Sequence, residues 1–475
     1  MKSKRLQFLG AGALLLATAV AGLTARGGVG FASVPRGPGK TVAVGDGPVR
    51  FTATLDRTAV LRGQDGTARL ELVISALRDA GKSGERRPTD LAIVLDGSGS
   101  MQGDKIEYAR AAVGELLAQL GPEDRFALVT YSDAATLTVP LSRVDDGGRE
   151  HWHETVSRIF PNGGTNMSSG LDLGIDVVER ARGDGRVPHV ILISDGLANQ
   201  GDPSLAGLTQ RAQRAARGEY MLSTVGVGAD FNESLMSALA DAGTGNYYYL
   251  ENAASLAEVF ARELGAARAT VVSGLAVQID PAAGVNVVDA AGYPLERNGS
   301  SVVFRPGSLF EGQERRIWVT LGFPHDTLGE YEVGRLSLSY GADHERRTLH
   351  VENLPRIACV EGEEKFYSRL DVDAWSRSVI VDAYNRMQEE VAQAVKAGRR
   401  DEALHHVREF REHTAEMNEH LQSAPVGAQL DRAGKLERDV AAAFEGEDQG
   451  ERQNLLSKSA GAEAIDARRA GSKLK

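Results

Sequence analysis

The sequence predicts an α/β fold: a doubly wound, mostly parallel sheet with a flanking β-sandwich and a C-terminal helical extension. Over residues 88–268, short apolar runs alternate with segments of helical spacing, which is typical of parallel strands joined by crossover helices. Over residues 269–355, short alternating strands are separated by turn residues, a pattern typical of an antiparallel sandwich. From residue 356 onward, apolar residues recur every three or four positions, as they do on helices.

The parallel sheet is indicated most directly by two continuous apolar runs, Leu91–Leu95 and Val190–Ile193. Strands that are covered by helices on both faces have this composition. Helices are expected between the strands, at Lys105–Leu120, Glu154–Phe160 and Ser168–Ala181, because their apolar residues fall on one side.

The segments around this unit predict further elements. Residues 45–87 alternate as half-buried strands do, and we expect them to join the sandwich, which makes residues 88–268 an insert. Residues 356–445 are expected to be helical and to contain a helix hairpin that turns at Gly398. Residues 446–475 are rich in Ala, Glu, Lys and Arg, and we expect a weakly ordered tail there.

The N-terminal segment has the composition of an export signal. Residues 1–25 contain basic residues, then a short apolar run, then small residues, which predicts a signal peptide or anchor. Residues 26–44 are rich in Gly and Pro and are expected to be a linker. We therefore expect a bacterial protein that is periplasmic, secreted or membrane-anchored at the extracytoplasmic face. If the N-terminal segment is not cleaved, it would tether the protein to the membrane.

Charge and cysteine content exclude several function classes. The net charge of −11 argues against a nucleic-acid partner, because such proteins carry an excess of basic residues. The single cysteine, Cys359, rules out an internal disulfide and a cysteine metal cluster, and it is expected to be a buried apolar residue.

One set of polar residues follows the predicted strands. Asp96, Ser98 and Ser100 come directly after the first apolar run, and their alternate spacing places them on one side of an extended backbone. Thr165 lies on a glycine turn before a helix, and Asp195 ends the second apolar run. The carboxyl ends of parallel strands meet at one edge of a sheet, so these five residues, here called the oxygen cluster, should converge. Hard oxygen ligands without His or Cys suit Mg²⁺, with Mn²⁺ and Ca²⁺ as alternatives.

The order and spacing of the oxygen cluster resemble the metal-ion-dependent adhesion site of von Willebrand factor A domains. The family pattern is DxSxS, a later threonine after glycines, and an aspartate at a further strand end. The resemblance covers residues 88–268, and it implies that the two serines bind the metal directly while the other three bind it directly or through water. It also implies a protein partner whose acidic side chain completes the coordination. The flanking regions bear a looser resemblance to exported bacterial proteins called calcium-activated chloride channel homologues and to inter-α-trypsin inhibitor heavy chains.

Two other interpretations fit these residues less well. The spacing from Asp96 to Glu107 also fits an EF-hand loop, but Met101 stands where that loop needs glycine, and a strand precedes it. Capping and turn roles would explain any one of the five residues, but they account poorly for all five together.

An enzyme is not expected. Ser98 lies in a G-S-G sequence and not in the G-x-S-x-G of a hydrolase, and no phosphate-binding G-x-x-x-x-G-K-[ST] loop occurs. The histidine pairs His151/His153 and His405/His406 lack the ligand spacing of a zinc site. The sequence thus predicts an exported, metal-dependent protein-binding module. The alternative is a structural scaffold in which the metal only stabilises the fold.

Overall fold

The computed structural model describes most of the chain, in eight stretches: 41–77, 88–181, 186–195, 198–228, 232–250, 255–342, 345–446 and 448–470. The predicted signal segment, residues 1–25, and the predicted linker up to residue 40 lie outside these stretches.

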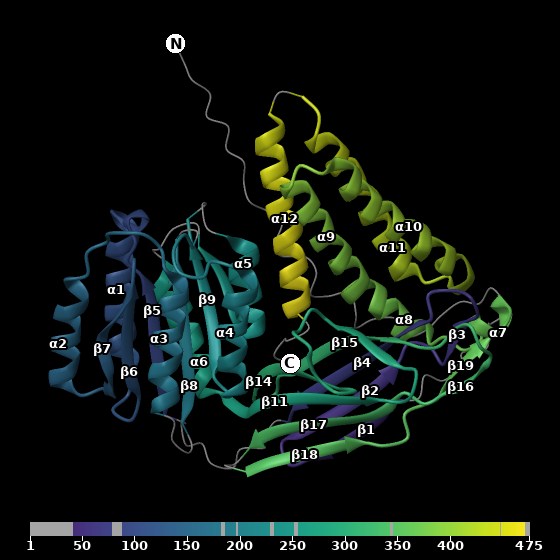
Figure 1. Cartoon of the computed structure of the whole chain (residues 1–475), viewed down its shortest axis with the longest axis horizontal. Coiled ribbons are helices and arrows are strands. Elements are labelled where there is room, and N and C mark those ends of the chain that lie inside the picture. Colours follow the sequence, from purple (N-terminus) through teal and green to yellow (C-terminus); the bar gives the residue numbers. More distant parts are fainter. Residues whose placement is uncertain are drawn as a thin grey trace, which may run out of the picture.

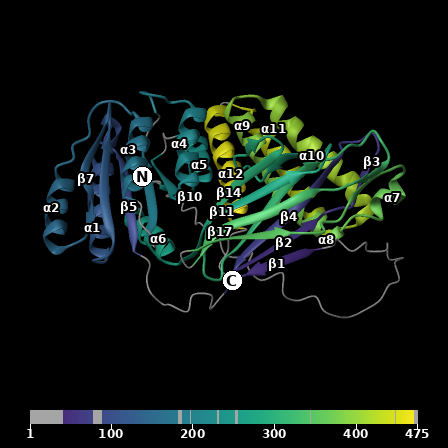
Figure 2. The same ribbon diagram turned by 60° about the horizontal axis from the view of Figure 1, so that its bottom comes forward.

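The molecule has three units (Figure 1): an α/β unit at the left and, at the right, a β-sandwich with a group of C-terminal helices above it. In the view turned by 60° (Figure 2), the α/β unit and the sandwich lie side by side along the long axis. The fold class predicted from the sequence is confirmed.

The α/β unit is built on a six-stranded sheet with the order β10-β9-β8-β5-β6-β7. Its strands are β5 (Thr89–Asp96), β6 (Arg125–Tyr131), β7 (Ala135–Arg143), β8 (Val187–Ser194), β9 (Met221–Val227) and β10 (Thr244–Leu250). All neighbours pair in parallel except β7, which pairs antiparallel with β6 at the edge. The central strands β5 and β8 are the two continuous apolar runs, because both their faces are covered.

Helices cover both faces of this sheet. One face packs against α1 (Asp104–Gln119), α2 (Asp146–Ser157) and α6 (Leu256–Arg268). The other packs against α3 (Met167–Arg180), α4 (Leu205–Arg217) and α5 (Glu233–Ala242). Helices α2 to α5 each follow a residue whose side chain accepts a backbone N–H of the first turn. These cap residues are Asp145, Asn166, Ser204 and Asn232.

Helix α2 differs from the prediction. A helix was expected at Glu154–Phe160, but α2 begins at Asp146, after its cap Asp145, and ends at Ser157. Phe160 therefore lies beyond the helix, and 75% of its surface is exposed. Strand β7 was not predicted, since its Pro140 and its mostly exposed residues lack the apolar run of its neighbours.

The sandwich consists of two five-stranded antiparallel sheets. The first has the order β1 (Val42–Asp46), β2 (Val49–Leu55), β4 (Thr67–Ala76), β15 (Glu314–Gly322) and β12 (Asn286–Ala290). The second has the order β13 (Glu296–Asn298), β14 (Ser301–Phe310), β11 (Thr270–Pro281), β17 (Gly334–Ala342) and β18 (Glu345–Val351). Strands from before Pro88 thus pair with strands from after residue 268, so the α/β unit is inserted between them.

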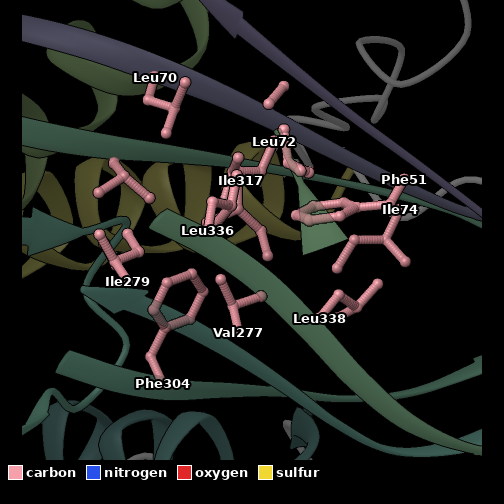
Figure 3. Close-up of a cluster of buried hydrophobic side chains, with 14 of the residues drawn as sticks. Phe51, Leu70, Leu72, Ile74, Val277, Ile279, Phe304, Ile317, Leu336 and Leu338 are labelled. Carbon is pink, nitrogen blue, oxygen red and sulfur yellow. The ribbon is translucent and has the colours of Figure 1, made fainter. Parts of the chain in front are cut away.

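The sandwich core lies between the two sheets (Figure 3). Leu70, Leu72 and Ile74 alternate along β4 and point toward Val277 and Ile279 of β11. All five are fully or almost fully buried, and each such side chain stabilises the fold by about 1.5–3 kcal/mol relative to an exposed one.

The C-terminal unit is helical, with a short sheet at its entrance. Strand β19 (Ile357–Val360) pairs with β16 (Gly329–Tyr331) and, in parallel, with β3 (Ala59–Leu61). The helices that follow are α7 (Glu363–Tyr367), α8 (Val372–Ser378), a π-helical turn η3 (Val379–Ala383), α9 (Tyr384–Lys396), α10 (Arg400–Leu421), α11 (Ala424–Ala443) and α12 (Gln449–Ala470). Helices α9 and α10 form the expected hairpin, which turns at Gly398 with a φ of 72°.

A buried carboxylate links these helices to the sandwich. Glu71 of β4 pairs with Arg316 of the neighbouring strand and accepts hydrogen bonds from Arg377 of α8, at 2.8 Å and 3.1 Å. Because Glu71 is almost fully buried, these arginines compensate its charge and hold α8 against the sheet.

Three predicted boundaries need correction. The expected linker, 26–44, already contains the start of β1, which pairs with β2. The expected helical region, 356–445, begins with strand β19, whose apolar residues include the buried Cys359. The expected weakly ordered tail, 446–475, contains helix α12, because its Ala, Glu, Lys and Arg residues favour helices and the helix packs on α9, where Gly461 lies against Ala392. Within the described stretches, no helix has the length and apolar character needed to cross a membrane.

Candidate metal centre

The oxygen cluster lies at the carboxyl edge of the parallel sheet. Asp96 is the last residue of β5, and Asp195 directly follows β8, the strand that pairs in parallel with β5. Thr165 lies in the loop just before α3. Ends of parallel neighbours open at the same edge, which is where such sheets bind ligands.

The first loop presents its two serines side by side. Ser98 is extended, with φ −67° and ψ 164°, and a short 3₁₀ turn follows at Gly99–Met101. The hydroxyl oxygens of Ser98 and Ser100 are 3.0 Å apart, so they share one hydrogen bond and face the same space. Met101 is buried in the core beneath, and α1 begins at Asp104. This geometry is a strand-to-helix loop and not the helix-to-loop entry of an EF-hand.

Asp96 is a buried carboxylate held by three donors. Its Oδ1 accepts the backbone N–H of Ser98 at 2.9 Å, and its Oδ2 accepts the hydroxyls of Ser194 at 2.7 Å and Tyr131 at 3.3 Å. Burial raises the pKa of Asp96, the hydrogen bonds from Ser98 and Ser194 oppose that rise, and the charge of Asp195 adds to it. Burial, followed by the charge of Asp96, also raises the pKa of Tyr131 well above its ordinary value, so its phenol stays a donor.

Asp195 extends the hydrogen bonding of the two serines. Its Oδ1 accepts the hydroxyl of Ser100 at 2.8 Å, and its Oδ2 pairs with the ammonium of Lys105 at 2.5 Å. The Asp195 side chain is fully buried, whereas one third of the Lys105 side chain is exposed.

Thr165 joins the cluster through backbone contacts of its loop. Its N–H donates to Asn199 Oδ1 at 2.8 Å, and its carbonyl accepts the N–H of Asn199 at 3.1 Å. The Gly99 N–H donates to the carbonyl of Gly163 at 3.1 Å, which fastens this loop to the serine loop. Gly163 has a φ of 69°, and a Cβ there would lie 2.7 Å from an oxygen of Asp133, so only glycine fits.

The five residues thus fall into three groups. Ser98, Ser100 and Asp195 are in direct contact through their side chains, Asp96 is joined to them through the Ser98 backbone, and Thr165 through the contact between loops. They offer two carboxylates and three hydroxyls, all oxygen donors. Two carboxylates buried close together repel each other, and a divalent cation would neutralise them. The donor set therefore fits a hard divalent ion.

Several supporting residues were missed by the sequence analysis. Ser194 and Tyr131 orient Asp96, Asn199 positions the threonine loop, and Lys105 pairs with Asp195. For Lys105 a signal was present: the residue lies in the first turn of a helix, where the helix dipole disfavours a cation. The contacts of the others depend on the fold and had no local signal.

A hollow of about 370 Å³ opens beside the serine loop. It lies between β6, β7 and the end of α2, and it borders the loop at Gly97 and Asn162. Its lining includes Thr130, Ser132, Thr136, Thr138, Thr155, Arg158 and Phe160. The guanidinium of Arg110 lies 5.3 Å from the ring centroid of Phe160 and supports this exposed ring.

The histidines take no part in this site. Within the described part of the chain, no group of three or more His, Cys, Asp or Glu residues could hold a metal ion.

Comparisons with known proteins identify what the α/β unit and the whole fold resemble. Residues 90–262 match the family model of the von Willebrand factor type A domain. Over 348 residues the chain is 24% identical to an uncharacterised protein of Synechocystis sp., and this match covers 71% of the chain and 81% of that protein. It is 29% identical over 161 residues to inter-alpha-trypsin inhibitor heavy chain H4 of Bos taurus, covering 32% of the chain but 17% of the heavy chain.

Among solved structures, a von Willebrand factor type A protein from Catenulispora acidiphila superposes with a TM-score of 0.61 at 17% identity. The superposition covers 90% of this chain and 97% of that one. The likeness therefore extends beyond the α/β unit to the flanking units of the fold.

Proposed function

We propose that the von Willebrand factor type A domain formed by residues 90–262 holds one divalent cation, Mg²⁺ first of all, and binds a carboxylate of a partner protein through it. Domains of this type commonly bind metal and mediate protein interactions. The proposal that this protein binds a metal and a partner carboxylate rests on one observation. The side chains of Ser98, Ser100 and Asp195 are linked by hydrogen bonds next to the buried carboxylate of Asp96.

Each member of the oxygen cluster has a role in this proposal. The hydroxyl oxygens of Ser98 and Ser100 are the direct ligands, because Ser100 can donate its proton to Asp195 and keep its lone pairs for the cation. Asp96, Asp195 and Thr165 bind directly or through water. When bound, the cation supplies positive charge at the edge of the sheet, and a partner carboxylate completes its coordination.

The hollow beside the serine loop gives this proposal a recognition surface. A partner segment whose acidic residue reaches the metal would place a neighbouring residue against Gly97 and Asn162, at the mouth of the hollow. The threonine and serine hydroxyls there would hydrogen-bond a polar side chain or backbone, and the exposed ring of Phe160 would cover an apolar one. The metal would supply affinity, and this hollow would supply selectivity.

The protein is proposed to act outside the cytoplasm. The composition of residues 1–25 supports export, and an uncleaved segment would place the domain at the extracytoplasmic face of the membrane. We propose a binding module without a catalytic step. The alternative, a scaffold whose metal only stabilises the fold, needs no open coordination position.

A peptide selection separates the two functions. Random peptides displayed on phage are selected on the immobilised full chain with Mg²⁺ and released with EDTA. The adhesion function predicts that released peptides share an Asp or Glu and do not bind Asp96→Ala. The scaffold function predicts no enrichment of EDTA-released peptides.

The same peptides test the hollow. Replacement of the exposed Phe160 by alanine should weaken peptide binding several-fold and leave Mg²⁺ affinity unchanged, because the ring lies outside the oxygen cluster. If Phe160→Ala binds every peptide as the wild type does, the hollow is not part of the recognition surface.

A further inference from the structure

We infer that Lys105 is an internal cation that competes with the metal for Asp195, and so sets the metal affinity and stabilises the metal-free site. This inference rests on the proposed function, because it concerns the same site.

A lysine at position 105 is unfavourable for the helix, and its contact with the oxygen cluster offsets this. It is the second residue of α1, where the positive end of the helix dipole disfavours a cation and where Asp104 and Glu107 are the expected residue type. The Lys105 side chain nevertheless turns toward the oxygen cluster. Its Nζ lies 2.5 Å from Asp195 Oδ2 and 3.3 Å from the carbonyl oxygen of Ser100.

The aliphatic part of the Lys105 side chain passes the backbone at Gly228. Gly228, directly after β9, has a φ of 82°, and a Cβ there would lie 3.6 Å from Lys105 Cε and 3.7 Å from Nζ. The stem therefore runs past a backbone without a side chain, at the same edge of the sheet as Asp195. The ammonium reaches a fully buried carboxylate while one third of the lysine side chain remains exposed.

The contact between Lys105 and Asp195 places a positive charge beside two buried negative ones. Asp96 and Asp195 are both buried, so two negative charges lie at one edge of the sheet and repel each other. Without metal, the ammonium of Lys105 compensates the negative charge of Asp195 and so reduces the repulsion between the two carboxylates. With a divalent cation beside Ser100, the same ammonium is a like charge next to the metal, and its hold on Asp195 competes directly with coordination.

The contact also fixes how Asp195 is oriented. One of its oxygens accepts from Ser100 and the other from Lys105, so both are occupied by protein donors. Direct coordination of the metal through Oδ2 would make the metal and the Lys105 ammonium share one oxygen, which weakens both contacts. Lys105 therefore favours a reversible site over a permanently loaded one.

The test compares three full-length chains by calorimetric titration with Mg²⁺ and by thermal unfolding: wild type, Lys105→Met and Lys105→Arg. Methionine keeps the length of the stem without the charge, and arginine keeps the charge. Removing a like charge this close should tighten Mg²⁺ binding at least about tenfold in Lys105→Met. Lys105→Arg should stay close to the wild type.

Thermal unfolding gives a second readout that a merely structural role would not produce. In EDTA, Lys105→Met should melt below the wild type, since Asp195 loses its compensating charge. In saturating Mg²⁺ it should melt at or above the wild type, because the metal takes over that compensation.

The outcomes separate the two proposals. Equal or weaker Mg²⁺ affinity in Lys105→Met, or the same loss of thermal stability with and without metal, overturns the role of Lys105 and leaves metal binding intact. Absence of Mg²⁺ binding by the folded wild type and by both variants overturns the metal centre and this inference with it.

Discussion

A buried ionic network in the α/β unit gives a prediction with a calculable magnitude. Glu263 of α6 lies against the sheet, almost fully buried, with its Oε2 2.7 Å from His189 Nε2 of β8 and 2.5 Å from the hydroxyl of Ser223 of β9. Its Oε1 accepts the amide of Asn246 at 2.8 Å and the hydroxyl of Tyr248 at 2.5 Å, both from β10. One carboxylate thus joins a helix to three strands.

The surroundings of Glu263 determine how much its negative charge contributes to the free energy of unfolding. Burial alone would raise its pKa, but attraction to His189 and the hydrogen bonds from His189, Ser223 and Tyr248 overcome this and lower the pKa from 4.5 to about 2. The difference is about 2.5 pH units, and at about 1.4 kcal/mol per unit the charged form stabilises the fold by about 3.5 kcal/mol. Since the folded pKa is the lower one, this stability is complete above about pH 4.5. It is lost as the pH falls toward 2.

Glu263→Gln should therefore reduce the free energy of unfolding by about 3.5 kcal/mol at pH 7. The deficit relative to the wild type should fall to roughly half by pH 3, because the carboxyl of the unfolded wild-type chain is protonated there while that of the folded chain is still mostly charged. The assay is urea unfolding at pH 7, 5 and 3, followed by Trp152 fluorescence in chains that carry Trp318→Phe and Trp375→Phe. Trp152 is then the one tryptophan left, and it is buried in the α/β unit.

A matched control is available on the same helix. Glu258 is exposed in the first turn of α6, and Glu258→Gln should cost at most about 1 kcal/mol. A deficit in Glu263→Gln that does not change between pH 7 and pH 3 would refute the electrostatic reasoning and indicate a packing effect. A deficit no larger than that of Glu258→Gln would refute the magnitude.

Four further predictions concern packing, support of the metal site and docking of the helices. Gly174→Ala in α3 should destabilise the α/β unit by about 1–3 kcal/mol in urea unfolding, since the new Cβ would lie 2.3 Å from a valine methyl of β5. Gly434→Ala in α11 meets nothing closer than 3.7 Å and should be neutral or stabilising by up to about 1 kcal/mol. Ser194→Ala removes a donor to Asp96 and should weaken Mg²⁺ binding about ten- to hundredfold in calorimetry, with an unchanged circular dichroism spectrum. Glu71→Gln should speed hydrogen exchange in α8 and η3, because the ion pair that holds α8 to the sheet is lost.

The elements that sequence reasoning could predict are those with a local signal. The strands β5 and β8 are continuous apolar runs because helices cover both their faces, so their ends could be located and the polar residues after them named. Asp96 and Asp195 were placed at adjacent strand ends on this basis, and the structure has them there. The sandwich strands before Pro88 were likewise visible from their alternation.

The features that were missed depend on tertiary contacts. Edge strand β7 carries Pro140 and exposed residues, because one side of it has no neighbouring strand. Helix α12 has few large apolar residues, and its order comes from docking on α9, which composition cannot show. The pairing of Lys105 with Asp195 joins the first turn of α1 to the loop after β8, and only the folded sheet edge brings them together.

The metal centre itself is tested most directly by calorimetric titration of the full chain with Mg²⁺, Mn²⁺ and Ca²⁺, beside Asp96→Ala and Asp104→Asn. Asp104 is exposed at the start of α1 and outside the oxygen cluster, but it would be a ligand of an EF-hand loop. We predict saturable one-site binding that is lost in Asp96→Ala and kept in Asp104→Asn. Circular dichroism should show that both variants are folded. Failure of the folded wild type to bind any of the three ions, or equal binding by Asp96→Ala, would contradict the assignment of the oxygen cluster as a metal site.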